Sequence, residues 1–402
     1  MSNAFIVNGV RSAIGGLGGS LSTLRADDLA ASILKALIAK FPAMDPALIG
    51  DVYMGCANQA GEDNRNIARM ALLLAGMPSV VPGETVNRLC ASGLAAAVNA
   101  ARAIANNDID LAIAGGVEHM TRAPWVISKA SQPFGRDSEM FDSSFGWRFV
   151  NPEMKRLFGT DSMGETAENL ASLYSISRDD QDQFAFWSQQ KAKKAVESGR
   201  LAKEICPVLV PKKKGNHEIF DKDEFIKPET NMEALAKLRP AFKKEGGSVT
   251  AGNSSGLNDG AAALLLASEK GIRLCNSSPL AIIRSSAVVG VEPRIMGIGP
   301  VEASRKALAN ANLSLGDMDV IEINEAFAAQ VLACTRQLGL DDMDSRINPN
   351  GGAIALGHPL GMTGARLLLS AAIQLQDTNK RFALVTMCIG VGQGYACIIE
   401  RA

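Results

Sequence analysis

The chain has 402 residues, of which 47% are hydrophobic and 21% charged, and its formal net charge is −1. This length is enough for two or three packed units, and a charge so close to zero gives no reason to expect a nucleic acid or an anionic membrane as partner. The longest unbroken apolar run, Ala261 to Ala267, is far shorter than the ~20 residues that cross a bilayer, and the N-terminus shows no secretion-signal pattern.

Seven cysteines are scattered along the chain without CxxC spacing, and the histidines are His119, His217 and His358. An odd cysteine count without clustered histidines argues against a disulfide framework and against a zinc site. We therefore expect reduced thiols, a cytoplasmic location and no metal. Any mechanism that needs a histidine has three candidates.

Short apolar runs alternate with helical patterns along the chain, and glycine-rich junctions separate them. The alternation favours an α/β protein with buried strands. The predicted elements, in chain order, are a helix over 28–40, a strand over 51–57, a helix over 91–105, a strand over 110–116, helices over 178–198 and 302–311, a strand over 319–326, a helix over 364–376 and a strand over 382–390.

The first and last thirds of the chain share one order of elements: a helix, a strand, a reactive residue before a second helix, and a second strand. Asp51 precedes Cys90 by 39 residues, the same interval that separates Asp319 from His358. Matching intervals of this kind suggest a duplicated half. The middle of the chain, about 121–248, is more polar, and we interpret it as an insertion whose charges lie mainly on a solvated surface.

Cys90 lies in "VNRLCASGLAAAVNAARAI" (86–104), where an extended stretch turns into an alanine-rich helix. A helix N-terminus presents free N–H groups and a partial positive charge, which favour an anion. We therefore expect a lowered pKa and a reactive thiolate at Cys90. The alternative from the residues alone is a small buried apolar side chain.

Three further junctions carry reactive residue types. His358 stands in the glycine-rich segment "NPNGGAIALGHPLGMTGAR" (348–366), where it can take a proton from a thiol or serve as a structural turn residue. Cys388 in "MCIGVGQG" ends an apolar strand, either as an acid/base beside amides that stabilise an oxyanion or as a core cysteine. Asn324 in "INEAFAAQ" either positions a water molecule or caps the following helix.

Together these four segments resemble the thiolase family, and further stretches that match are "RADDLA", "GGVEHMTRAP", "DSMGETAEN", "AKLRPAF" and "VTAGNSSGLNDGAAA". The resemblance covers essentially the whole chain. Within the family, "GCANQAGEDNRNIARMALLLAGMP" (55–78) and "FGWRFVNPEM" (145–154) look most like bacterial members that act on 3-oxoadipyl-CoA.

The resemblance implies a five-layered αβαβα fold built from two duplicated halves with an inserted loop domain. It places the N-terminal half at 1–120, completed by 249–272, the CoA-binding loop domain at 121–248, and the C-terminal half at 273–402. It also implies CoA thioesters as substrates, no tightly bound cofactor, and a homotetramer built from dimers.

The resemblance further implies residue roles. Cys90 is the nucleophile that carries the acyl group, His358 accepts its proton and helps bind the thioester oxygen, and Cys388 protonates the departing acetyl-CoA carbanion. Asn324 holds a water molecule in one oxyanion hole, and the amides of Cys90 and Gly390 form the other. The expected reaction is cleavage of 3-oxoadipyl-CoA with CoA to acetyl-CoA and succinyl-CoA.

For CoA binding, the family pattern points to Lys227, Ser255 and Phe327. Lys227 stands where short-chain relatives often carry arginine, so it meets a phosphate without a bidentate fork. Ala234 occupies a position where such relatives can have serine, which puts one polar contact to CoA in doubt. Ser162 replaces a histidine typical of acetoacetyl-CoA thiolases and so weakens a short-chain reading.

A substrate that ends in a carboxylate needs a cation at its far end, and we assign this role to Arg148 in "GWRF", because arginine suits carboxylate recognition. The alternative is an arginine that makes a loop-domain or oligomer contact. Three other functions stay open: a broad 3-ketoacyl-CoA or acetoacetyl-CoA thiolase, a decarboxylating ketosynthase, and a non-catalytic acyl-CoA binder.

Overall fold

The computed structural model describes residues 2–402. Its centre is a ten-stranded sheet with the order β12-β13-β14-β11-β1-β10-β5-β3-β4, and the short strand β2 pairs with β10. The strands are β1 (Phe5–Arg11), β2 (Gly15–Gly16), β3 (Asp51–Gly55), β4 (Glu84–Val86), β5 (Leu111–His119), β10 (Asn258–Ala267), β11 (Ala281–Gly290), β12 (Val320–Ile323), β13 (Phe382–Ile389) and β14 (Gln393–Arg401).

The two halves of this sheet repeat one pattern of strand directions. In the first half β3 is parallel to β5, β5 is antiparallel to β10, and β10 is antiparallel to β1. In the second half β12 is parallel to β13, β13 is antiparallel to β14, and β14 is antiparallel to β11. The halves join where Phe5 and Ile6 of β1 pair with β11. The same sequence of pairings in both halves supports the duplication expected from the matching intervals.

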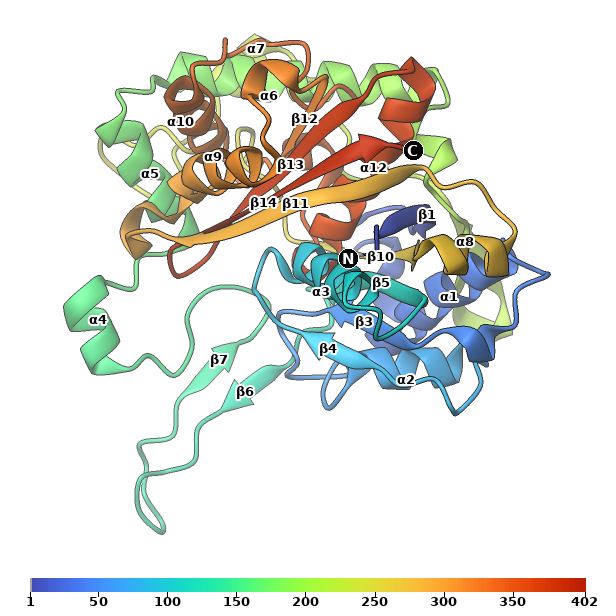
Figure 1. The fold of residues 1–402 in the computed structure, drawn as a ribbon. Coiled ribbons are helices and arrows are strands. Elements are labelled where there is room, and N and C mark those ends of the chain that lie inside the picture. Colours follow the sequence, from blue (N-terminus) through green and yellow to red (C-terminus); the bar gives the residue numbers. More distant parts are fainter. Residues whose placement is uncertain (1) are drawn as a thin grey trace.

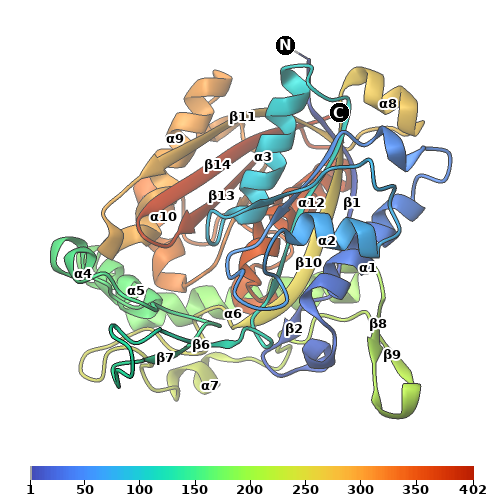
Figure 2. The same cartoon turned by 90° about the horizontal axis from the view of Figure 1, so that it is seen from below.

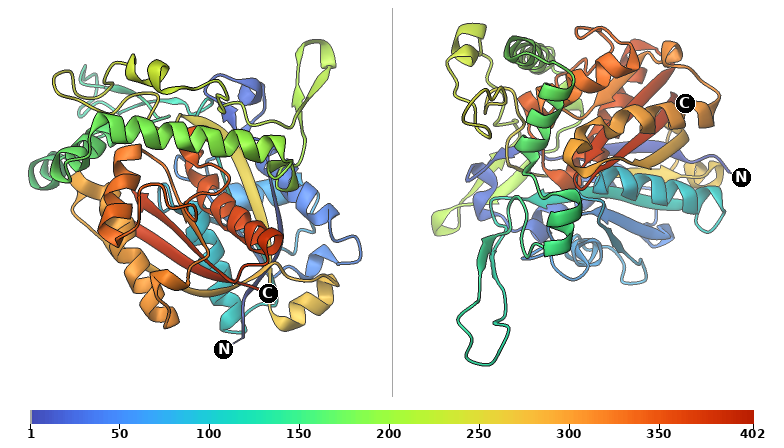
Figure 3. Two further views of the ribbon diagram at one scale, coloured as in Figure 1. Left: turned by 90° about the horizontal axis from the view of Figure 1, so that it is seen from above. Right: turned by 90° about the vertical axis from the view of Figure 1, so that its left-hand side faces the viewer.

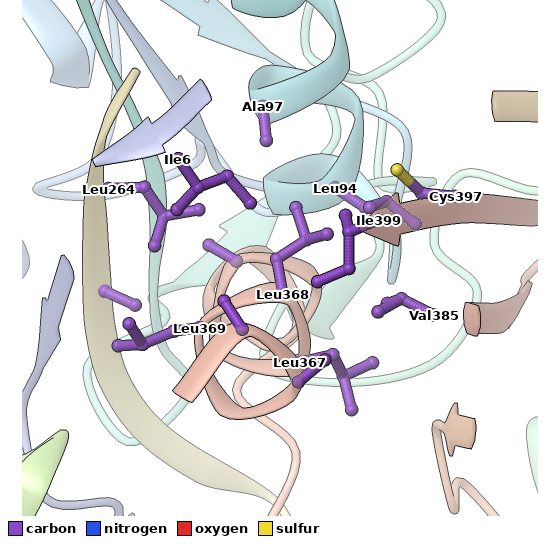
Figure 4. Packing of buried hydrophobic residues seen from close by; sticks show 14 of the residues in the cluster. Ile6, Leu94, Ala97, Leu264, Leu367, Leu368, Leu369, Val385, Cys397 and Ile399 are labelled. Atoms are coloured by element: carbon purple, nitrogen blue, oxygen red, sulfur yellow. The ribbon is translucent and has the colours of Figure 1, made fainter. Parts of the chain in front are cut away.

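Helices α3 (Ser92–Ala105) and α12 (Leu360–Thr378) pack against each other between the two halves of the sheet (Figure 2). Leucines of α12 fill the space between Ile6 and Leu264 on one side and Ile399 on the other (Figure 4). Glycine allows this close approach, because a Cβ on Gly93 would lie 2.5 Å from the Gly361 carbonyl oxygen. The starts of both helices are therefore held together.

Further helices cover the outer faces of the sheet (Figure 1). Helices α1 (Ala26–Ala39) and α2 (Ile67–Leu74) pack on the first half, together with α8 (Glu269–Cys275), around a second hydrophobic cluster. Helices α9 (Gly299–Ala311) and α10 (Ala328–Leu338) pack on the second half around a third cluster. Outer helices, one half of the sheet, the α3–α12 pair, the other half of the sheet and further outer helices make the five layers that the resemblance implies.

The segment between β5 and β10 lies outside these layers and crosses one end of them (Figure 3). Its long helix α6 begins after a capping box at Ser177, which satisfies N–H groups of the first turn. The hairpin β6–β7 projects away from the body (Figures 1 and 3). The elements of the segment are β6 (Trp125–Ile127), β7 (Met140–Asp142), α4 (Pro152–Phe158), α5 (Met163–Leu173), α6 (Arg178–Glu197), β8 (Val208–Pro211), β9 (His217–Phe220) and α7 (Met232–Ala236).

The predicted strands and helices all exist, and the differences lie at their ends. The helix predicted over 364–376 begins at Leu360 in the structure, because Pro359 is its N-cap residue. The strand predicted over 319–326 ends at Ile323, where the chain turns towards α10. A short helix, α11 (Ala353–Leu356), precedes His358. No helix among residues 2–402 combines the length and apolar character needed to span a membrane.

Candidate active site

Cys90 lies in the turn between β4 and α3, one residue before the N-cap residue Ala91. Leu89 has a φ of 46°, a left-handed conformation that costs energy for a bulky residue. The Ser92 hydroxyl holds this turn by accepting from the Arg88 amide at 2.9 Å and donating to the Leu89 carbonyl at 2.7 Å. The turn presents the thiol to two cavities, a position that favours a reactive role for Cys90 over that of a core cysteine.

His358 lies immediately before α12, and its surroundings fix the position of its ring proton. The Asn258 side chain accepts from the His358 amide at 2.9 Å. Nδ1 of His358 lies 2.7 Å from the Thr363 hydroxyl, which itself donates to the Pro359 carbonyl at 2.8 Å. Because the hydroxyl proton is already donated to the Pro359 carbonyl, the hydroxyl oxygen accepts a hydrogen bond from Nδ1–H. Nε2 is then free of hydrogen and able to accept a proton.

Asn324 follows β12 and is completely buried. Its amide nitrogen Nδ2 lies 3.3 Å from Nε2 of His358, which agrees with a lone pair on that ring nitrogen. The N-cap residue of α10 is Phe327 and not Asn324, so the helix-cap alternative for Asn324 is wrong. Its Oδ1 has no hydrogen-bond partner among residues 2–402, and a buried polar atom of this kind is commonly satisfied by water.

Cys388 and Gly390 lie where β13 turns into β14. The Cys388 side chain is fully buried and faces the cavity that Cys90 and His358 also line. The Gly390 amide lies beside the Cys90 sulfur and acts to lower the pKa of that thiol, against the larger effect of burial. Val391 has a φ of 63°, unfavourable for a β-branched residue, so this turn, like the one before Cys90, stores backbone strain beside the sulfur atoms.

Burial decides the charge state of the three reactive groups. It raises the pKa of Cys90 to about 11, although hydrogen bonds from the amides of Gly390 and Cys90 oppose the shift. Burial also raises the pKa of Cys388 well above its usual range, with Cys90 as a second cause. Burial and then Arg366 lower the pKa of His358 to about 3. The lowered pKa that we expected for Cys90 at the helix start is therefore wrong, because desolvation of the thiolate outweighs the favourable effect of the helix end.

Two cavities meet at Cys90, and Met120, Phe145, Met163 and Leu360 also line both. The first, of about 400 Å³, carries Asn58, Glu118 and Arg148; we name it the Arg148 cavity. The second, of about 430 Å³, carries Lys227, His358 and Cys388; we name it the Lys227 cavity. Each cavity has one side chain that is cationic at neutral pH, Arg148 in the first and Lys227 in the second.

The three predicted CoA-binding residues all line the Lys227 cavity. Lys227 is exposed, with its Nζ atom 5.3 Å from the centre of the Phe225 ring. The Ser255 hydroxyl donates to the Ala326 carbonyl at 3.2 Å, and the Phe327 ring packs edge-on against Phe242. This combination of an apolar wall and an exposed cation suits a ligand with an apolar arm and a phosphate end.

Arg148 is half-buried in the Arg148 cavity and contacts only neutral oxygen atoms. Its Nη2 donates to the Asn58 side chain at 3.1 Å, and its Nη1 donates to the Ser143 carbonyl at 3.3 Å. The structure records no ion pair for it among residues 2–402. Ser162, in contrast, does not face either cavity but caps α5 through a capping box with Glu165.

The other two histidines lie away from these cavities. His119 is buried at the end of β5, with Nε2 3.2 Å from the Leu21 carbonyl oxygen and Nδ1 3.3 Å from Asp259. His217 is exposed on the hairpin strand β9. Among residues 2–402, the two cavities therefore hold one histidine, His358, together with Cys90 and Cys388.

Sequence reasoning missed Glu118, which lines the Arg148 cavity. Its signal was a charged residue within the apolar run of β5, every residue of which is buried. With Cys56 and Asp63 it forms a cluster whose ligand atoms lie within 4.8 Å of one another. Backbone amides already donate to both carboxylates, so we interpret the group as a hydrogen-bonded cluster and not as a metal site.

Comparisons with known proteins decide the family. The model described as "Thiolase, N-terminal domain" matches residues 4–270, and "Thiolase, C-terminal domain" matches residues 277–401. The chain belongs to the thiolase family. It is therefore an acyltransferase, and CoA thioesters are the substrates that this family implies.

Relatives match over their full length. A protein of Escherichia coli (strain K12) named 3-oxoadipyl-CoA/3-oxo-5,6-dehydrosuberyl-CoA thiolase is 58% identical over 401 residues, 100% of both chains. A beta-ketoadipyl-CoA thiolase of Pseudomonas aeruginosa is 56% identical, covering 99% of this chain and 98% of the relative. The crystal structure of the Bacillus anthracis acetyl-CoA acetyltransferase superposes with a TM-score of 0.92 at 39% identity, covering 100% of this chain and 99% of that one. This thiolase has the fold that its sequence predicts.

Proposed function

We propose that this thiolase cleaves 3-oxoadipyl-CoA with CoA, giving acetyl-CoA and succinyl-CoA through an acyl-enzyme on Cys90. The observation that carries the proposal is the meeting of two cavities at the Cys90 sulfur, each with one cation. Lys227 suits a phosphate of CoA, and Arg148 suits the carboxylate at the far end of the acyl chain. The names of the relatives agree with this substrate.

The first half of the reaction forms the acyl-enzyme. The Cys90 sulfur attacks C3 of the substrate while the thiol proton passes to Nε2 of His358, because neither charged form is stable alone in so dry a site. The amides of Cys90 and Gly390 stabilise one developing oxyanion. The C2–C3 bond then breaks, and Cys388 donates its proton to the carbanion of acetyl-CoA. His358, together with a water molecule held by Asn324, stabilises the enolate oxygen of this leaving group.

The second half transfers the acyl group to CoA. The Cys388 thiolate accepts the proton of the incoming CoA thiol, and the CoA sulfur attacks the acyl-enzyme. The Cys90–acyl bond breaks, and the Cys90 thiolate recovers its proton from protonated His358. Every protein group ends in its starting state, so the chemistry needs neither a metal nor a redox cofactor. Cys90 and Cys388 must both be thiols, which supports a reducing, cytoplasmic environment.

The substrate is tested by measuring CoA-dependent cleavage of 3-oxoadipyl-CoA and acetoacetyl-CoA side by side. We expect a higher kcat/KM for the carboxylated substrate. The change Arg148→Met should raise KM for 3-oxoadipyl-CoA roughly 10- to 100-fold, the value of a charged hydrogen bond, with little change for acetoacetyl-CoA.

The matched control is Arg156→Met, since Arg156 lies on α4 of the same segment, exposed and paired with Glu153. Equal losses on both substrates in the Arg148 variant would contradict the assignment and favour a loop-contact role. Comparable cleavage of both substrates by the unmodified protein would indicate a broad or short-chain thiolase instead.

We also propose that four copies assemble through the projecting hairpin β6–β7. Its large apolar side chains are exposed, with Phe134 wholly so and Trp125, Ile127 and Met140 more than half. Such a group of exposed apolar side chains marks an interaction surface. A second copy of the same chain is the partner that the thiolase resemblance implies.

A further inference from the structure

Glu118 is a buried acid that the reaction scheme above does not use. It lies near the end of β5, and 2% of its surface is exposed. Burial of an unpaired carboxylate is costly, so its partners show why the fold tolerates it. The carboxylate reaches the wall of the Arg148 cavity, close to Cys90.

The Glu118 carboxylate accepts three hydrogen bonds from backbone amides. Oε1 accepts from Asn58 at 3.0 Å, and Oε2 accepts from Ala57 at 3.0 Å and from Gly361 at 2.9 Å. Gly361 lies in the first turn of α12, so the partial positive charge of that helix end also favours the anion. One side chain thus binds two segments of the chain that are about 300 residues apart.

Each of these segments carries a functional group. Gly361 is three residues beyond His358, in the turn that orients the imidazole. The Asn58 side chain is the acceptor for Nη2 of Arg148. Glycines bring the segments together, because a Cβ on Gly361 would clash with backbone atoms of Gly55 and Val117. The Glu118 carboxylate therefore connects the start of α12, next to His358, to Asn58, the residue that holds Arg148.

We infer that Glu118 is a positioning residue, which in its ionised form holds the His358 helix start and the Asn58 loop in the geometry that the reaction needs. The inference rests on the proposed function for the role of His358. It assigns Glu118 no proton transfer to the substrate.

The charge of Glu118 changes near neutral pH. Burial raises its pKa to about 7, although the three amides oppose the shift and Asp63 adds to it. The other titratable groups facing it are the thiols of Cys56 and Cys90. Because the anion is the form that three N–H groups need, activity should be full above pH 7 and fall as the pH drops through 7.

The experiment follows kcat for acetoacetyl-CoA cleavage from pH 5.5 to 9 in the unmodified protein and in Glu118→Gln. We expect the acidic fall in kcat to be absent in the variant, with kcat at pH 8 reduced between about 10- and 100-fold, as for a misplaced catalytic group. Glu322 and Lys191 also have pKa values of about 7 but lie outside both cavities. The difference between the two profiles is therefore the readout.

Two further variants keep the result interpretable. Glu118→Asp retains the charge with a shorter side chain and should keep the acidic fall at a lower kcat, so it serves if Glu118→Gln fails to fold. Glu62→Gln makes the same chemical change outside both cavities, in a pair with Arg122, and should leave the profile unchanged.

A second readout needs no substrate. Burial is the main cause of the raised pKa of Cys90, and the negative charge of Glu118 adds to it. In Glu118→Gln, Cys90 should therefore react faster with iodoacetamide at pH 8.5 than in the unmodified protein, although the variant turns over more slowly. A variant with unchanged kcat and the same acidic fall would overturn the inference. If the unmodified protein does not prefer 3-oxoadipyl-CoA, only the proposed substrate is contradicted. The role of Glu118 is measured with acetoacetyl-CoA, which carries no terminal carboxylate, so that test is independent of the substrate preference.

Discussion

The two halves of this thiolase share one topology but use it differently. In the first half, the link from β5 to β10 is an insertion of more than a hundred residues, whereas in the second half the link from β13 to β14 is the three-residue turn 390–392. The long link supplies Arg148 and Lys227, and the short one supplies Gly390. In the proposed mechanism, the connection in one half therefore binds the substrate, and the equivalent connection in the other half contacts an oxyanion.

The starts of the two central helices, α3 and α12, also differ between the halves. At the start of α3 a strained turn presents the Cys90 thiol, and at the start of α12 an ordered hydrogen-bond chain through Thr363 fixes the tautomer of His358. Because α3 and α12 pack together at their glycines, the two starts face the same cavity. The repeated topology thus brings Cys90 and His358, the proposed nucleophile and base, to one cavity.

The largest effects should come from the two cysteines, one from each half. Cys90→Ser should lower kcat by more than about a thousandfold and abolish labelling of the protein by radioactive acetyl-CoA, because the nucleophile is lost. Cys388→Ser should lower cleavage about a hundredfold or more, while labelling at Cys90 should be slowed but not lost, since the nucleophile remains and only the group that protonates the departing CoA sulfur is removed. Cys206→Ser, outside both cavities, is the control. Loss of labelling in the Cys388 variant would show that the roles are not divided between the halves.

A smaller effect is expected where the halves touch. In Gly364→Ala the new Cβ would lie 2.6 Å from that of Leu94, and overpacking of this kind costs about 1–3 kcal/mol. Thermal unfolding should show a lower Tm for this variant. The control Gly316→Ala should have an unchanged Tm, because its Cβ would make only an ordinary contact, 3.5 Å from the Ser314 hydroxyl. Equal Tm values would mean that the α3–α12 contact is looser than the structure indicates.

The smallest effect on a single copy is expected in the insertion. Phe134→Ser should leave the fold and the Tm of the monomer unchanged but weaken assembly, because burying a Phe side chain is worth about 1.5–3 kcal/mol per copy. Sedimentation velocity should then show smaller species than for the unmodified protein, while Leu209→Ser on the other hairpin should not. An unchanged distribution would remove the hairpin β6–β7 from the interface.

Much of the fold and the site was predictable from local patterns. The apolar runs of β5 and β13 and the helical spacing around Leu94 and Val98 each lie within a short window, so the elements could be read directly. The order of Cys90, Asn324, His358 and Cys388 in their own motifs indicated the family. These signals are local because strand and helix propensity, capping and glycine turns act over a few residues.

The tertiary structure alone decided how the site works. Glu118 accepts from Gly361, 243 residues away, and no window of the sequence contains both. The charge state of Cys90 also depended on residues far away in the sequence. Its position at a helix start predicted a thiolate, whereas burial by distant segments raised its pKa to about 11. Solvent exclusion and long-range contacts depend on every packed layer at once. The sequence by itself therefore determined which candidate reactive residues the chain carries, and packing determined their charge and their geometry.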